Sequence, residues 1–275
     1  MKNNEDLTRL SSDKARLKAF LEGLYFVYNR RELVFPDPLV FLYGYDDPLD
    51  REVVGLIASC LAYGRVAQIL KSVEKILAPM GACPHCFLLE EKPRSQSFFQ
   101  TLFKDFKHRF TTGKDMAALL ERVSQILREY GSLEALLKEG LQREGTLLAA
   151  LNFFSHELTL RKEGLRKGFP LLTAPEDGSA CKRLSLYLKW MTRRDEVDPG
   201  GWTAISPKNL LMPTDTHIHR IALQLGLTKR KQADLTTVLE ITQNFAKLTP
   251  EDPTRYDFVL SRFGIRQGLN ISDVI

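Results

Sequence analysis

The sequence lacks the features that mark several large classes of protein. It contains no apolar run close to the roughly 20 residues that a membrane-spanning helix needs. Its first residues, MKNNEDLTRL, are polar and partly acidic, which is unlike the charged start and apolar stretch of a secretory signal. We therefore expect a soluble cytoplasmic protein without a membrane partner.

Cysteine is also scarce, with only four residues in 275. They are Cys60, Cys83, Cys86 and Cys181. In a chain of this length without an export signal we expect thiols and no structural disulfides. Cys83 and Cys86 have the spacing of half a zinc site, but no second Cys/His pair follows at finger spacing. We expect no metal and no cofactor, and the sequence leaves open whether this pair binds a metal ion.

Strand-like alternation of apolar and polar residues is scarce, whereas apolar residues recur at spacings of three and four. This pattern predicts an all-α protein. The expected helices lie at roughly 14–30, 48–63, 66–80, 113–129, 131–139, 144–160, 179–194, 214–226, 232–247 and 253–265, with connecting loops at 81–96 and 163–177. Prolines after Asp37, Asp47 and Asp252 predict three capped helix starts.

No repeat, low-complexity tract or clear linker divides the chain. With 44% hydrophobic residues, the chain has enough apolar surface for a sizeable core. We predict a single helical domain over 1–275, built from two packed lobes. One lobe covers about 48–160, and the other combines the N-terminal helix with 178–267. The sequence leaves the oligomeric state open.

A net charge of +5 and a pI near 8.9 are mildly basic. Such an excess suits a nucleic-acid surface only if the charges cluster. Two clusters stand out, on the helix around 182–194 and in the segment FKDFKHRFTTGK at 103–114. The second cluster has an alternative interpretation as a solvated loop and helix start.

Two predicted helix starts carry side chains that are typical of catalytic sites. Lys182 lies in the first turn of the helix in GSACKRLSLYLKWM, where the positive end of the helix dipole disfavours an ammonium. Asp215, or Thr214 beside it, caps the helix that begins in PTDTHIHRIALQLGL. An amine at such a place becomes nucleophilic when it is desolvated. The alternatives are a solvated surface lysine and an aspartate that serves only as a cap.

The stretch PTDTHIHRIALQLGL resembles the aspartate-bearing helix start of helix-hairpin-helix DNA glycosylases, the endonuclease III superfamily. Its bifunctional members have a lysine at the start of an upstream helix, where Lys182 stands. The segment VVGLIASCLAYGRVAQILKSV resembles the early helix pair of the superfamily, with Tyr63 and Gly64 in place of the usual Gln-Thr. The chain also resembles, over most of 35–267, a bacterial family known as domain of unknown function 2400.

This resemblance implies a helix-hairpin-helix glycosylase-like fold and an N-glycosylase that acts on a damaged base in DNA, with possible AP lyase activity. Lys182 would attack the sugar C1′ and form a Schiff base, while Asp215 would take up a proton or stabilise the developing positive charge. DNA is the expected partner. The residues that we expect to contact it are Arg183, Lys189, Arg193, Lys107, Arg109, His217 and Arg220.

Two alternatives remain for the function. The chain could be a catalytically inactive, helical nucleic-acid-binding relative of the same fold. It could also be a metal-dependent hydrolase that uses His217 and His219, which with Asp215 mimic a D-x-H-x-H motif. That motif works on a strand; on a helix these two histidines point about 200° apart and do not readily share a metal ion.

Overall fold

The computed structural model describes residues 13–90, 95–159 and 171–265, and these consist mostly of helix. The prediction of an all-α protein is confirmed. The α-helices and strands of these ranges are α2 (Lys14–Tyr28), α3 (Pro48–Cys60), α4 (Val66–Leu77), α5 (Pro84–Leu88), α6 (Gln96–Leu102), β1 (Lys107–His108), β2 (Thr111–Thr112), α7 (Gly113–Tyr130), α8 (Leu133–Glu144), α9 (Leu147–Thr159), α10 (Lys182–Thr192), α11 (Thr216–Gln224), α12 (Leu235–Ala246) and α13 (Asp257–Ile265). None of the helices in these ranges has the length and apolar character needed to cross a membrane.

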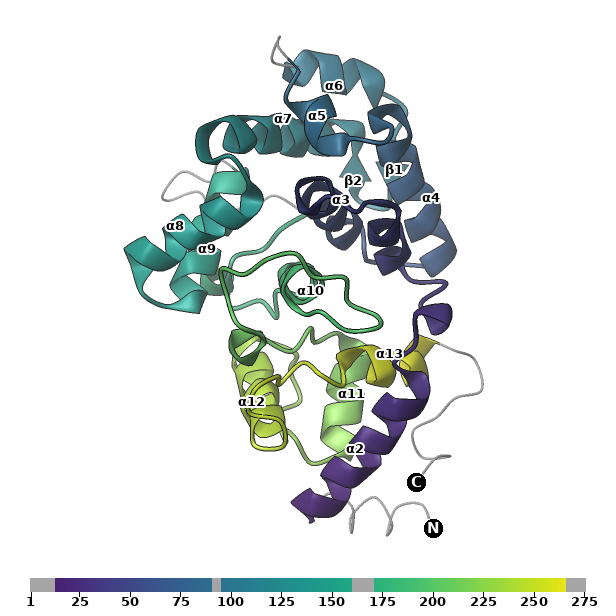
Figure 1. Cartoon of the computed structure of the whole chain (residues 1–275), viewed down its shortest axis with the longest axis vertical. Helices are drawn as coiled ribbons and strands as arrows, with labels where there is room; N and C mark the ends of the chain where they lie inside the picture. Colours follow the sequence, from purple (N-terminus) through teal and green to yellow (C-terminus); the bar gives the residue numbers. More distant parts are fainter. Residues whose placement is uncertain (1–12, 91–94, 160–170, 266–275) are drawn as a thin grey trace.

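Helix α10 lies at the centre of the molecule, as Figure 1 shows. In this view helices α3 to α7 and the β1–β2 hairpin lie above it, α8 and α9 lie to its left, and α2, α11, α12 and α13 lie below it. Helix α10 packs against α3, while α13 contacts both α11 and α2. The N-terminal helix therefore lies among the last helices of the chain. The assignment of these groups to two lobes of one domain stays a prediction.

Aspartate caps fix two of the three helix starts predicted at Asp-Pro pairs. The carboxylate of Asp47 accepts the N–H of Leu49 at 2.8 Å at the start of α3, and Asp37 caps a 3₁₀ helix in the same way. Asp252 differs, because its carboxylate accepts the Thr254 N–H within a turn and α13 begins only at Asp257. The third predicted start is therefore four residues too early.

The buried side of α10 forms a large part of the core. Tyr187, Trp190 and Met191 are all at most 1% exposed, so they are packing residues of the core. Gly55 of α3 makes the close approach possible, because a Cβ there would lie 3.3 Å from the side chains of both Met191 and Tyr187. Close packing against α3 therefore fixes the position of α10. Lys182 lies at the start of the same helix.

The segment before α7 differs from the sequence prediction. The predicted loop at 81–96 contains α5, and its residues 91–94 lie outside the described part of the chain. Helix α6 and the small β1–β2 hairpin follow, although the pattern predicted neither. Within 103–114, His108 and Thr111 are fully buried, so this segment is not simply a solvated loop. The predicted connection at 163–177 lies partly outside the described residues.

The structure corrects the prediction for one pair of cysteines. Cys83 and Cys86 form a disulfide, with their Cα atoms 5.2 Å apart, so the expectation of four thiols is wrong for this pair. The reason is local: Pro84 begins the one-and-a-half-turn helix α5, and its first turn brings Cys86 back towards Cys83. Cys60 and Cys181 are buried thiols, as expected.

Candidate active site

Lys182 lies in the first turn of α10, as the sequence predicts, although the helix begins at Lys182 itself and not at about residue 179. The residue before it, Cys181, has φ +46° and occupies the left-handed region, which a non-glycine residue rarely adopts. Its thiol donates to the carbonyl of Thr173 at 3.3 Å, and this contact helps to hold the entry to the helix. The sharp turn at Cys181 sets the direction in which the Lys182 side chain leaves the backbone.

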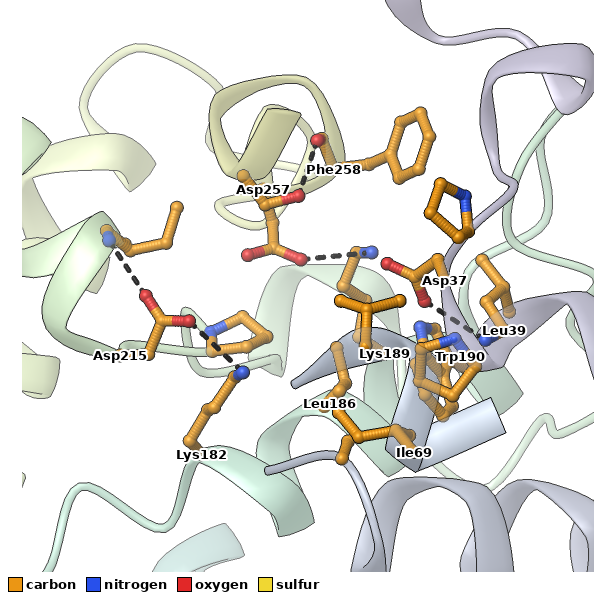
Figure 2. Close-up of a pocket in the computed structure, with 17 residues that line it drawn as sticks. Asp37, Leu39, Ile69, Lys182, Leu186, Lys189, Trp190, Asp215, Asp257 and Phe258 are labelled. Atoms are coloured by element: carbon orange, nitrogen blue, oxygen red, sulfur yellow. Dashed lines mark hydrogen bonds and ion pairs between the residues drawn. The ribbon is translucent and has the colours of Figure 1, made fainter. Parts of the chain in front are cut away.

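Asp215 caps α11 and at the same time faces Lys182. Its Oδ1 accepts the backbone N–H groups of His217 and Ile218, each at 2.9 Å. Its Oδ2 lies 3.1 Å from Nζ of Lys182, and Figure 2 shows the two side chains pointing toward one another. One carboxylate oxygen is therefore held by the helix start, and the other is presented to the amine.

The surroundings of Asp215 favour its ionised form. Burial alone would raise the pKa of this carboxyl, but the Lys182 ammonium and the two backbone N–H groups lower it more strongly. The net pKa of Asp215 lies below the usual value, so the group is a carboxylate at neutral pH. Side chains of Lys182 and Asp215 are 33% and 28% exposed, so solvent and small groups reach the pair.

The pair opens into a cavity of about 80 Å³, several times the space that one water needs. Much of its wall is apolar (Figure 2) and includes Leu39, Ile69, Leu186, Trp190 and Phe258. Two more carboxylates, Asp37 and Asp257, also line it. Asp37 pairs with Arg262 at 2.6 Å. An apolar wall strengthens the electrostatic interactions of the charged groups inside it.

The sequence interpretation placed Lys189 and Arg193 on an exposed basic face, but the structure buries both side chains. They are 1% and 3% exposed. Nζ of Lys189 lies 3.1 Å from carboxylate oxygens of both Asp198 and Asp257. The guanidinium of Arg193 pairs with Asp198 and Asp195 and, at 2.8 Å, with Asp252. Because they are buried and paired, we no longer assign phosphate contacts to these two residues.

Both buried cations keep their charge. Burial alone would lower the pKa of Lys189, but Asp198 and Asp257 raise it above the usual value. Burial acts against Arg193 in the same way, and its carboxylate partners raise its pKa well above normal. The cluster thus joins the end of α10 to the loop that follows and to the start of α13.

Asp257 is a pocket residue that the sequence reasoning missed. It is the first residue of α13 and 5% exposed, and burial raises the pKa of its carboxyl although Lys189 acts against this. Figure 2 shows it between Lys189 and the Lys182–Asp215 pair. In the sequence, Asp257 lies in the stretch PEDPTRYDFVLSRFG, and no local pattern relates it to Lys182.

The other predicted DNA contacts lie at three places. Arg183 follows Lys182, and its guanidinium lies 5.3 Å from the centre of the Tyr63 ring. Lys107 and Arg109 are exposed on the hairpin. On α11, Arg220 is exposed and His217 is half-buried. All five remain predicted contacts. Arg183 directly follows Lys182 in the sequence.

The two histidines of the metal alternative do not converge. Nε2 of His219 lies 2.8 Å from the carbonyl oxygen of Arg230, so this nitrogen already has a partner. In the described part of the chain, no group of three or more His, Cys, Asp or Glu side chains is arranged to hold a metal ion. Of the predicted pairings, the structure brings together Lys182 and Asp215.

Comparison with protein families adds one match. Residues 37–266 match the family described as a protein of unknown function, DUF2400. The chain belongs to this family. The DUF2400 match contains both Lys182 and Asp215, and the predicted resemblance to this family is confirmed. No curated protein and no solved structure matches the chain.

Proposed function

We propose that this DUF2400 protein has a helix-hairpin-helix glycosylase-like fold and is an N-glycosylase that acts on a damaged base in DNA. The proposal assigns the nucleophile to Lys182 and the proton acceptor to Asp215, and it gives the same lysine an AP lyase activity. The observation that carries it is the 3.1 Å contact between the two side chains in one cavity. Their helix starts lie in distant parts of the chain.

The chemistry begins with a proton transfer. The Lys182 ammonium must lose a proton before it attacks, and Oδ2 of Asp215 is in hydrogen-bond reach to accept it. The neutral amine then bonds to the sugar C1′ as the bond from C1′ to the base breaks, and the base leaves with the bonding electrons. A second proton leaves the nitrogen, O4′ takes up a proton, and the ring opens to give an imine.

The cavity supports the charge changes of this sequence. Positive charge develops on the sugar as the base departs. Asp215 passes the proton that it took from Lys182 to the departing base, and the carboxylate that this restores, which its low pKa favours, stabilises the charge. The apolar wall limits the water around the pair, so this interaction is stronger than on an open surface. The target nucleotide must leave the base stack, because its C1′ is out of reach within a duplex.

A second candidate is a catalytically inactive nucleic-acid-binding protein of the same fold. The Lys182–Asp215 contact supports this reading too, because an ion pair between two helix starts also joins α10 to α11. In that case the pair has a structural role, and the basic residues Arg183, Lys107 and Arg109 bind phosphates. The difference between the two candidates is chemical, so a covalent test separates them.

Borohydride trapping provides that test. We would incubate the protein with duplexes that carry an abasic site or an oxidised base and add borohydride, which delivers hydride to the imine carbon and leaves a stable secondary amine. We expect a covalent protein–DNA adduct that disappears in Lys182→Ala. Lys208→Ala is the matched control, because this lysine is exposed on a 3₁₀ turn and does not line the cavity.

The outcomes separate the two candidates. An adduct that persists in Lys182→Ala would rule out Lys182 as the nucleophile. DNA binding that weakens with salt, without an adduct on any of these substrates, would support the inactive binding protein.

A further inference from the structure

The turn of the β1–β2 hairpin presents an exposed aromatic side chain. Only Arg109 and Phe110 connect the two strands, whose pairing ends at His108 and Thr111. Phe110 is 77% exposed, the highest value among the exposed large hydrophobic side chains of the described residues. Arg109 has φ +52°, where a glycine would be the unstrained choice in such a turn. The tip thus carries two large side chains at a conformational cost.

The base of the hairpin is held by buried hydrogen bonds. Burial lowers the pKa of His108, so its ring is neutral; Nε2 donates to the carbonyl of Tyr63 at 2.9 Å, and Nδ1 accepts from the hydroxyl of Ser72 at 2.9 Å. The Tyr63 hydroxyl donates to the carbonyl of His108 at 2.8 Å and contacts the Thr111 hydroxyl at 2.6 Å. These contacts fix an exposed tip on a rigid base.

The segment that holds the hairpin also forms part of the cavity wall. Ala62 and Val66, on either side of Tyr63 and Gly64, line the cavity of Lys182 and Asp215. Gly64 lies against the Arg109 side chain, since a Cβ there would be 2.8 Å from Cδ of Arg109. Figure 1 shows the hairpin beside α4, which begins at Val66. The tip and the cavity are therefore linked by one short, well-packed segment.

The surroundings of the tip are positively charged. A groove of about 830 Å³ runs beside the hairpin and is lined by Lys104, Lys107 and Lys114, with Asp105 as its acidic residue. All three lysines are exposed. Arg109 adds a fourth cation at the tip itself. An exposed aromatic ring beside several cations matches the two parts of a DNA duplex, namely stacked bases and phosphates.

We infer that Phe110 is a wedge that inserts between base pairs of duplex DNA while the adjacent sugar enters the cavity of Lys182. The inference rests on the proposed function and adds to it the residue that opens the stack. Lys107 and the groove lysines hold the phosphates beside the opened step. Insertion of an apolar side chain unstacks a base step, and the contacts of the bent duplex offset that cost.

The test compares duplex with single-stranded DNA in the trapping reaction. The sugar of an abasic site in a duplex must leave the helix to reach Lys182, whereas in a single strand no stack has to be opened. We expect Phe110→Ala to lower the rate of duplex trapping about tenfold and to leave the single-strand rate unchanged. Phe110→Leu, which keeps an apolar wedge, should retain most of the duplex rate. Phe26→Ala is the control, because Phe26 is 74% exposed on α2.

The failures of the two proposals give different results. If the wild type traps neither substrate, the proposed function is wrong and the wedge falls with it. If the wild type traps both substrates and Phe110→Ala leaves the ratio of duplex to single-strand rates unchanged, only the wedge is wrong. The second result is also the one expected if Phe110 contacts another protein.

Discussion

Nζ of Lys189 lies 3.1 Å from Oδ2 of Asp257, and this buried pair closes one side of the cavity that holds Lys182 and Asp215. Two lysines of the same helix therefore have different environments. Lys182 at the start of α10 is one-third exposed and faces a single carboxylate, whereas Lys189 is 1% exposed and lies between two. The first arrangement suits a group that must react, and the second suits a fixed structural charge.

We predict that Lys189→Met lowers the free energy of unfolding by about 3–5 kcal/mol, because it leaves Asp198 and Asp257 buried without their cation. Urea unfolding followed by circular dichroism would measure the change. Lys208→Met at an exposed site is the control and should stay within about 0.5 kcal/mol of the wild type. Equal stability of Lys189→Met and the wild type would contradict the buried charge cluster.

The lowered pKa of Asp195 predicts how the stability of the fold depends on pH. Burial alone would raise the pKa of its carboxyl, but Arg193 and the N–H groups of Val197 and Asp198 lower it to about 2. Because the folded pKa is below the unfolded value, the resulting stability of about 2 kcal/mol is fully present above pH ~5, decreases below it and is lost as the pH falls through about 2.

Unfolding of the wild type and of Asp195→Asn at pH 7, 4 and 3 would check this dependence. The difference in unfolding free energy between them should be constant from pH 7 to about 5 and should shrink towards pH 3. A difference that does not change with pH would show that the charge of Asp195 makes no contribution.

Asp215 caps α11, and the proposed function gives it a catalytic role as well; substitution separates the two. Asparagine caps a helix about as well as aspartate, so Asp215→Asn should change stability little, whereas Asp215→Ala should cost about 1 kcal/mol. Neither variant carries the negative charge, so both should lose borohydride trapping at least 100-fold, on the order of one lost charge-stabilising group. Thermal unfolding and the trapping rate are the two measurements. Trapping by Asp215→Asn near the wild-type rate would show that only the cap matters.

Local signals in the sequence predict the helix starts but not all of the site. The cap at Asp215 and the position of Lys182 follow from residue types within a few positions, and both match the structure. The contact between them was expected from a resemblance, since no local rule relates residues in separate helices. The burial of Lys189 could not be predicted, because its partners Asp198 and Asp257 lie beyond the end of its helix.

The hairpin shows the same limit for long-range contacts. Its strands have two residues each, too few for a recognisable alternating pattern. The burial of His108 depends on Tyr63 and Ser72, which precede it by 45 and 36 residues. Basic and aromatic residues in 103–114 indicated a solvated segment. In the structure Lys107, Arg109 and Phe110 are exposed to solvent, as this interpretation predicts. His108 and Thr111 are buried, which corrects it.

The proposed phosphate contacts of the hairpin predict how DNA binding should depend on salt. Each phosphate contact releases condensed counterions, so the slope of log K against log salt should decrease in magnitude by about 0.9 for each contact removed. We expect Lys107→Ala and Arg109→Ala each to reduce the slope by about this amount, and Lys208→Ala to leave it unchanged. Fluorescence anisotropy of a labelled duplex between 50 and 200 mM salt would measure it, a range chosen because binding changes strongly there. Lys189→Met is a second control. Its cation is buried and contacts no phosphate, so the folded variant should bind DNA with the wild-type slope.

If Lys107→Ala and Arg109→Ala bind with the wild-type slope, the hairpin does not contact the DNA backbone.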